Sequence, residues 1–476
     1  FWLKFQAARV RGVPIPSSGA SVSLALTPGR ACRSCLDVMT YAAWSVSCIH
    51  WAALLLLASS DVVNPDEWQT IVLEGAAQQQ GAVCLDGTAS AYYFRPSPGS
   101  TKWILFLQGG GWCATIDECY WMSTGVTGSN RTFLADKAQN LETFQGGAHG
   151  FLSSDPEVNP YFYNFNKIIV RSCDGGSWSA DVEAPQVASN GVPVFFRGFR
   201  ILKAIVDNVL LQMGPEGKEL VVSGCSSGGH AVWMHLDHVR QWVPQSIRVV
   251  GIPASGIFLN MPTWNSTEYP HDAVKRFEDC FAIMGMASTL NKECIDSIYD
   301  PAEKWKCFMV EYQIPYIKTP YFAVNSMFDK WNLQSIVKVQ VPCVWGLDMG
   351  RYMTMCDPHE ITAINKIRRQ MLQALQQRTP STAASYFSYN CVEHCGQLQH
   401  DHQWNRLRID GTSLRSAIAD WYYNGTAAAL VGTFGPNVNI QCRLGPHDAV
   451  YAKQVEYAMN LLVPRQSNFK QRLLLL

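Results

Sequence analysis

Two adjacent serines lie in a glycine-rich stretch that has the spacing of a nucleophile site. Residues Gly224 to Gly228 read G-C-S-S-G, which matches the motif G-x-S-x-G and makes Ser226 the candidate nucleophile. Residues 219–223 predict a buried strand before it, and residues 229–243 predict a helix after it. This motif requires such a strand-to-helix turn, because the turn exposes the serine hydroxyl at a helix N-terminus. A glycine-rich turn without chemistry is the alternative.

A serine nucleophile needs backbone donors for the oxyanion that forms when it attacks a carbonyl. Three consecutive glycines follow the predicted strand 103–107 in the stretch LQGGGWC. Because glycine has no Cβ, the amides of Gly110 and Gly111 can approach the reacting oxygen, and the amide of Ser227 completes the candidate hole. We expect the Ser227 hydroxyl to be incidental. Trp112 is a tentative substrate-pocket residue, with core packing as the alternative.

The general base should be a histidine that a carboxylate orients, in the chain order Ser, acid, His. Asp329 follows the predicted strand 321–325, and active sites form at the carboxyl ends of parallel strands. Three other acids lack that combination of order and placement: Asp174, Asp348 and Asp357. We expect Asp174 to order its loop and His230 to lie behind the nucleophile turn. Three histidines after the last predicted strand remain candidates for the base: His394, His400 and His402.

Short apolar runs predict the strands that position these groups. They are residues 103–107, 167–171, 219–223, 247–252, 321–325 and 385–390. Amphipathic patterns predict helices between them, at residues 199–213, 229–243 and 360–377. Continuous hydrophobic strands that alternate with helices are typical of an α/β fold with a mostly parallel sheet covered on both faces. Residues 255–320 are less regular and carry Cys280, Cys294 and Cys307, which predicts a disulfide-tied helical insertion able to cap the site.

The composition is that of a globular protein without a strong charge. The 476 residues are 47% hydrophobic and 16% charged, and 38 basic side chains balance 38 acidic ones. No basic surface field is therefore expected to attract nucleic acid, and we expect no nucleic-acid partner and a monomer. The chain shows no internal repeat, so a single catalytic domain is expected.

The N-terminal part has the composition of a targeting segment. An apolar run at residues 51–58 ends in small residues, as a secretory signal does before its cleavage site. An N-terminal membrane anchor is the alternative, although the run is short for a membrane span. The expected organisation is upstream or leader sequence at 1–38, a signal peptide or anchor at 39–60, one esterase domain at 61–465 and a tail at 466–476.

The cysteines favour an oxidising compartment. Three of the sixteen, Cys32, Cys35 and Cys48, precede residue 61, and the thirteen that remain suit a disulfide-braced secreted protein. Because thirteen is odd, one thiol should stay free, and Cys225 is our candidate. Three sequons are tentative glycosylation sites in such a protein: Asn130, Asn265 and Asn424.

A zinc site is the competing use of these cysteines. Cys391 and Cys395, followed by His400 and His402, could supply ligands, but their spacing is not that of a common zinc finger. We therefore expect no metal, and the proposed chemistry requires no cofactor.

Seven blocks span about residues 81 to 404: GAVCLDGT, LQGGGWC, VRSCDGGSW, FRGFRI, GCSSGG, VNSMFDKW and NCVEHC. In sequence and order they resemble the pectin acetylesterase family, which also includes the Notum carboxylesterases. The resemblance implies an α/β-hydrolase fold with a Ser-Asp-His triad. By the matching positions, the triad is Ser226, Asp329 and His394, and the oxyanion donors are Gly110, Gly111 and Ser227. The triple glycine resembles the plant and microbial members more than Notum.

Two residues depart from the family pattern. Gln108 stands where the family usually has glutamate, and Ser227 stands where it usually has alanine. The resemblance implies a secreted serine carboxylesterase that acts on O-acetyl esters of a cell-wall polysaccharide such as pectin. Three alternatives remain: a Notum-like fatty-acyl (palmitoleoyl) protein carboxylesterase, a serine peptidase on the same fold, and a non-catalytic glycan-binding protein.

Overall fold

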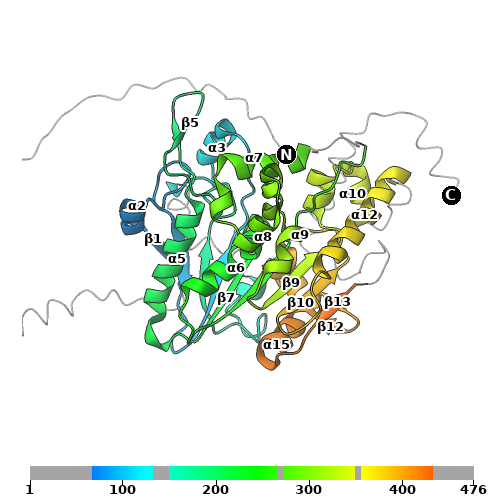
Figure 1. Cartoon of the computed structure of the whole chain (residues 1–476). Coiled ribbons are helices and arrows are strands. Elements are labelled where there is room, and N and C mark those ends of the chain that lie inside the picture. Colours follow the sequence, from blue (N-terminus) through cyan, green and yellow to red (C-terminus); the bar gives the residue numbers. More distant parts are fainter. Residues whose placement is uncertain (1–66, 132–148, 266–271, 349–354, 433–476) are drawn as a thin grey trace, which may run out of the picture. The chain divides into compact units, whose positions relative to one another are not determined.

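The computed structural model describes residues 67–131, 149–265, 272–348 and 355–432 (Figure 1). The expected leader, signal or anchor segment and C-terminal tail lie outside these residues, as do both boundaries of the expected domain 61–465. Within the described ranges, no helix is both long enough and apolar enough to cross a membrane.

One large sheet carries the candidate site, and its nine strands run in the order β1-β2-β4-β3-β7-β8-β9-β10-β13. From β4 to β13 all neighbours pair in parallel, whereas β2 pairs antiparallel with both β1 and β4. The bounds are β1 (Gln69–Val72), β2 (Ala91–Arg95), β3 (Lys102–Leu107), β4 (Asn166–Val170), β7 (Glu219–Cys225), β8 (Arg248–Ala254), β9 (Tyr321–Ser326), β10 (Ala384–Tyr389) and β13 (Ala429–Val431). Two small sheets pair β5 (Gln186–Val187) with β6 (Pro193–Val194), and β11 (Arg408–Ile409) with β12 (Thr412–Ser413).

All six predicted strands are confirmed, as β3, β4, β7, β8, β9 and β10, with ends displaced by two residues or fewer. The three predicted helices are also confirmed, as α5 (Gly198–Met213), α6 (Ser227–Trp242) and α12 (Pro358–Leu375). The prediction missed β1, β2 and β13. These strands lie toward the edges of the sheet, and β1 and β13 are short and only partly buried, so their sequences lack the continuous apolar run of a central strand.

The sheet is covered on both faces. In β3, Trp103 and Leu105 belong to one hydrophobic core with residues of α5 and α6, while Ile104 and Phe106 belong to a second core on the opposite face. The second core includes residues of α14 (Asp401–Arg406) and α15 (Leu414–Asn424). Figure 1 shows α5 and α6 in front of the strands around β7. The expected α/β-hydrolase-like architecture is therefore present.

Helical turns fill the segment between β8 and β9, as the prediction required. They are α7 (Asp272–Ile283), η4 (Met286–Ser288), α8 (Lys292–Ser297), η5 (Pro301–Phe308), α9 (Val310–Gln313) and η6 (Ile314–Tyr316). A disulfide between Cys294 and Cys307 ties α8 to η5, so the disulfide-tied helical insertion is confirmed. Cys280 takes no part in it, since its buried thiol is free.

The remaining described elements are helices or helical turns of at most 8 residues. They are α2 (Glu74–Gln80), α3 (Ile116–Ser123), η2 (Gly150–Leu152), η3 (Gly214–Glu216), η7 (Asn332–Ile336), α10 (Val341–Asp348) and α13 (Gly396–Gln399).

The disulfides correct one expectation. The bonded pairs with both partners described are Cys84–Cys173, Cys113–Cys119, Cys225–Cys395, Cys294–Cys307 and Cys343–Cys356. The prediction of Cys225 as the unpaired thiol is wrong, and among the described cysteines Cys280 is the free one. Cys225 and Cys395 are 170 residues apart, but Cys225 is the last residue of β7 and Cys395 lies in the loop after β10, so the parallel sheet brings them to the same edge.

Candidate active site

Ser226 lies between the last residue of β7 and the first residue of α6. Its φ of 59° and ψ of −130° are unusual for a residue with a side chain, and the tight turn between strand and helix imposes them. The flanking glycines are required by close packing. A Cβ at Gly228 would lie 2.0 Å from the Leu107 carbonyl oxygen, and one at Gly224 would lie 2.6 Å from the Gly228 carbonyl oxygen. The nucleophile-turn geometry predicted from the motif is therefore present.

Asp329 follows β9, and its side chain is fully buried. Its Oδ2 accepts a hydrogen bond from His394 Nδ1 at 2.7 Å. Its Oδ1 accepts from the backbone N of Asn332 at 3.0 Å and from Asn332 Nδ2 at 3.1 Å. Three donors thus hold the carboxylate in one orientation. Sequence reasoning missed Asn332, whose only signal was its position three residues after the acid.

His394 lies in the loop after β10 and joins Asp329, as the family resemblance implied. A carboxylate can only accept, so Nδ1 carries the hydrogen and Nε2 is left unprotonated when the ring is neutral. Nε2 is buried and has no hydrogen-bond partner among the described residues, so the bond to Ser226 is not formed in this state. Catalytic hydrogen bonds often tighten only when substrate binds. The rivals His400 and His402 stack on each other, with ring centroids 5.7 Å apart, and neither lines the cavity at Ser226.

Two contacts hold the His394 loop at the nucleophile turn. The Cys225–Cys395 disulfide joins the residue before Ser226 to the residue after His394. The hydroxyl of Ser255 accepts from the Cys395 amide at 3.2 Å and from Gln397 Nε2 at 2.9 Å. The base is thus positioned by covalent and polar contacts as well as by Asp329.

The glycine loop approaches Ser226 closely, as the triple glycine predicted. A Cβ at Gly109 would lie 2.6 Å from Ser226 Cβ, so no other residue fits there without movement. The amides of Gly110 and Gly111 both donate to Ser227 Oγ, at 2.8 Å and 3.1 Å. The expectation that the Ser227 hydroxyl is incidental is therefore wrong, because this hydroxyl binds both loop amides considered as oxyanion donors.

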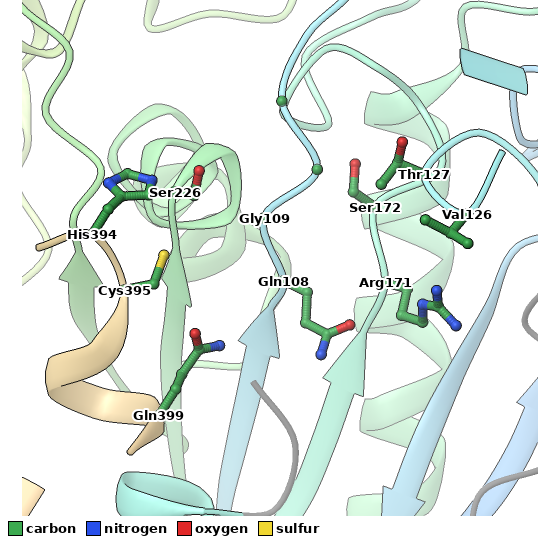
Figure 2. A pocket seen from close by; sticks show the side chains of 12 residues that line it. Gln108, Gly109, Val126, Thr127, Arg171, Ser172, Ser226, His394, Cys395 and Gln399 are labelled. Carbon is green, nitrogen blue, oxygen red and sulfur yellow. The ribbon is translucent and has the colours of Figure 1, made fainter. Parts of the chain in front are cut away.

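A cavity of about 330 Å³ opens beside Ser226 and His394. Figure 2 shows these two side chains on one side of it and Ser172, Thr127, Val126 and Arg171 on the other, with the loop at Gly109 between them. The lining residues are Gln108, Gly109, Gly110, Gly111, Val126, Thr127, Arg171, Ser172, Ser226, His394, Cys395 and Gln399. None of them is acidic, and Val126 supplies the one hydrocarbon side chain. Polar side chains therefore predominate among the lining residues, and the cationic Arg171 lies in the wall.

Trp112 does not line this cavity. Its indole Nε1 donates to Ser177 Oγ at 2.7 Å, and its ring packs edge-to-face against a cluster of aromatic rings. The cluster consists of His230, Phe258, Phe277 and Trp331, with centroids 4.7–5.6 Å from Trp112. The apolar surface beside the triad is thus filled by side chains of the protein itself. The insertion contributes Phe258 and Phe277 to this cluster but no lining residue to the cavity.

Two buried ionisable groups, Asp174 and His230, lie outside the cavity and bind neighbouring backbone groups. Asp174 Oδ2 accepts from the amides of Gly176 and Trp178, at 3.2 Å and 2.7 Å, which fits its expected role in ordering the loop. Burial raises the pKa of Asp174 to about 6 despite these bonds. His230 lies on α6, as expected, and its Nε2 contacts the Phe308 carbonyl oxygen at 2.7 Å. Burial lowers the pKa of His230 to about 3. Neither group lines the cavity.

The other two acids that the sequence offered, Asp357 and Asp348, lie at helix ends. Asp357 caps α12, where its side chain accepts from the His359 amide at 2.7 Å, and Asp348 ends α10.

The two cysteines of the considered zinc site are both in disulfides. Cys395 is bonded to Cys225, and Cys391 is also in a disulfide, so neither offers the thiolate that zinc requires. The same holds for a cluster formed by Cys343, Cys356 and Glu360, because these two cysteines are bonded to each other.

The three sequon asparagines differ in their surroundings. Asn130 is buried, and its Nδ2 donates to the Ala89 carbonyl at 2.6 Å, so its amide is not presented for modification. Asn265 and Asn424 are exposed.

The chain matches the pectinacetylesterase family over residues 64–443. It is 31% identical over 387 residues to pectin acetylesterase 5 of Arabidopsis thaliana, which covers 78% of this chain and 84% of that protein. It is 27% identical over 350 residues to the palmitoleoyl-protein carboxylesterase NOTUM of Drosophila melanogaster, which covers 72% of this chain and 47% of that protein.

The fold also resembles a solved structure. The Wnt deacylase Notum from Drosophila superposes with a TM-score of 0.66 and 24% identity, covering 79% of this chain and all of that one. At this level of identity, the structural similarity shows only that the two proteins share a fold, which is an α/β-hydrolase fold.

Proposed function

This chain belongs to the pectinacetylesterase family and is a carboxylic ester hydrolase, and we propose that it removes acetyl groups from an acidic polysaccharide. The observation that carries the proposal is the 2.7 Å bond between His394 Nδ1 and Asp329 Oδ2 beside Ser226, at the wall of a cavity with mostly polar lining side chains. Ser226 is the proposed nucleophile, His394 the base and Asp329 the group that orients the base.

In the proposed mechanism, His394 Nε2 takes the hydroxyl proton of Ser226, and Oγ attacks the ester carbonyl carbon. The oxyanion forms beside the amides of Ser227 and the glycine loop. When the C–O bond breaks, the sugar oxygen leaves with the proton that His394 held. Water then attacks the acetyl-enzyme while His394 takes its proton, and acetate leaves as the Ser226 hydroxyl is restored. Asp329 keeps its charge throughout and stabilises the protonated imidazole.

The cavity supports a short acyl group on an anionic polymer. Binding a fatty-acyl chain requires apolar surface, since each buried methylene contributes about 0.8 kcal/mol. Val126 is the one hydrocarbon side chain of the lining, and the aromatic cluster around Trp112 is closed on itself. The cationic Arg171 side chain lines the cavity, which suits the carboxylates of a uronic acid polymer such as pectin.

We also propose that the protein is secreted as a monomer with an N-terminal signal peptide. The disulfides between described cysteines support an oxidising compartment. Exposed Asn265 and Asn424 are the proposed glycosylation sites.

The test measures hydrolysis of p-nitrophenyl esters by the wild type and by Ser226→Ala. The expected result is highest kcat/KM for acetate, falling through butyrate and octanoate to palmitoleate, and a loss of about 10³-fold or more in the variant. A maximum at palmitoleate would instead favour the fatty-acyl carboxylesterase. Equal rates in wild type and variant would contradict the triad, and binding of acetylated pectin without turnover would favour the glycan-binding alternative.

A further inference from the structure

The Ser227 side chain occupies an unexpected position next to the nucleophile. Ser227 is the first residue of α6, and its side chain is fully buried. Its Oγ accepts from the Gly110 amide at 2.8 Å and from the Gly111 amide at 3.1 Å. A hydroxyl oxygen has two lone pairs, so these two bonds use its full accepting capacity.

These two amides face away from the reaction in the resting state. Each amide has one hydrogen, and here both hydrogens point to an oxygen that does not line the cavity. The tetrahedral oxyanion forms on the cavity side, where Gly110, Gly111 and Ser226 do form part of the lining. The loop amides therefore cannot serve the oxyanion fully while they remain bonded to Ser227 Oγ.

We propose that the Ser227 hydroxyl masks the oxyanion hole in the resting enzyme and that the oxyanion must displace it during each acylation and deacylation. The proposal rests on the proposed function, because it concerns the transition state of that ester hydrolysis. Exchange is favourable for the amides, since a hydrogen bond to an anion is about twice as strong as one to a neutral hydroxyl. The exchange nevertheless breaks the two hydrogen bonds that Ser227 Oγ accepts from the loop amides. Their loss raises the activation free energy of acylation and of deacylation.

The glycine loop can make this exchange. Gly111 has a φ of +75°, and a Cβ built there would meet no atom within 4 Å, so its backbone has room to turn. Gly110 is packed more closely, since a Cβ there would lie 2.6 Å from Ser172 Cβ. An alanine at position 227 would keep the backbone amide of that residue and remove the competing acceptor. Ser227 thus acts on the reaction through the loop amides and is a positioning residue rather than a catalytic one.

The experiment compares Ser227→Ala with the wild type on p-nitrophenyl acetate. A neutral intramolecular hydrogen bond has a net value equivalent to roughly twofold to tenfold in an equilibrium constant. For two such bonds we expect kcat to rise by roughly fourfold to a hundredfold with KM little changed, because the relief is felt only in the transition state. The affinity for phenylboronic acid, which forms a tetrahedral adduct with a serine nucleophile, should rise by a similar factor.

Ser223→Ala is the matched control, since Ser223 is also a buried serine and its hydroxyl donates to the Ile252 carbonyl at 2.7 Å on β8. This variant should lose stability without a gain in kcat. An unchanged or lower kcat in Ser227→Ala, with the folded fraction measured by active-site titration, would overturn the masking proposal. If that variant does not fold, Ser227→Gly provides the same comparison and the same two outcomes. Failure of the proposed function would appear separately, as a wild type no more active than Ser226→Ala.

Discussion

At the scale of single residues, the candidate site depends on how tightly one carboxylate is held. Asp329 is fully buried, and it binds His394 through one oxygen and two donors of Asn332 through the other. Asn332 is itself anchored, since its Nδ2 donates to the Ile257 carbonyl at 2.8 Å and its Oδ1 accepts from the Leu259 amide at 3.1 Å. The imidazole orientation is therefore set before substrate arrives.

Asp329→Asn should lower kcat by roughly 10⁴-fold and leave KM nearly unchanged. An amide can turn its NH₂ group toward Nδ1, which would then accept, and the hydrogen would move to Nε2, where it prevents proton removal from Ser226. The measurement is steady-state hydrolysis of p-nitrophenyl acetate. Asp357→Asn, at the N-terminus of α12, is the control and should retain full activity. A loss under tenfold for Asp329→Asn would contradict the assigned role.

At the scale of elements, the proposed nucleophile and the proposed base come from distant parts of the chain. Ser226 follows β7 and His394 follows β10, and two strands, β8 and β9, separate β7 from β10 in the sheet. The Cys225–Cys395 disulfide joins these two loops, and the hydroxyl of Ser255, which directly follows β8, accepts from the Cys395 amide. This bridge therefore links catalytic geometry directly to stability.

The double variant Cys225→Ala/Cys395→Ala should lower both stability and kcat. Loss of a bridge between distant residues lowers the free energy of unfolding by about 2–5 kcal/mol, and the freed loop should hold His394 less well beside Ser226. The measurements are urea unfolding and kcat on the acetate ester. The matched variant Cys294→Ala/Cys307→Ala, in the insertion, should lose stability and retain kcat. Equal kcat in both double variants would show that the bridge has no positioning role.

At the scale of the whole molecule, both faces of the sheet are covered and the polar groups between the layers are deeply buried. His230 connects α6 to the insertion through the Phe308 carbonyl. Asp174 lies in the loop after β4, and a Cβ at Gly198 of α5 would lie 2.3 Å from its Oδ2. Burial shifts both pKa values, but with opposite effects on the pH dependence of stability.

The lowered pKa of His230 means that the unfolded state binds protons more tightly. Its contribution to stability is present above pH 6.5 and is lost as the pH falls toward about 3. The raised pKa of Asp174 has the reverse effect, since its contribution is present below pH 3.8 and is lost as the pH rises through about 6. Each effect is on the order of a few kcal/mol.

On acidification, the free energy of unfolding should therefore fall less in His230→Gln than in the wild type. In Asp174→Asn it should fall more than in the wild type. The measurement is the free energy of unfolding in urea at several values between pH 4 and pH 7. Each variant is the control for the other, because the two slopes should change in opposite directions. Parallel changes would contradict the assigned burial of one of the two groups.

The local features of the protein could be predicted from its sequence. The six central strands, three helices and the turn at Ser226 follow from apolar runs, amphipathic periodicity and glycine spacing, all of which act over a few neighbouring residues. The edge strands β1 and β13 could not be predicted in this way, since their partly buried residues form strands through pairing with a neighbour.

The tertiary structure decided the contacts between distant residues. Spacing could not separate His394 from His400 and His402, although the family resemblance pointed to His394, and the bond to Asp329 distinguishes it from them. The pairing of Cys225 with Cys395 and the binding of two loop amides by Ser227 were also unreadable from local pattern. The order of strands in the sheet determines which loops meet, and no short stretch of sequence contains that order. The sequence by itself thus pointed to Ser226 as the proposed nucleophile and determined its supporting strands, while the packed sheet determined which distant residues surround it.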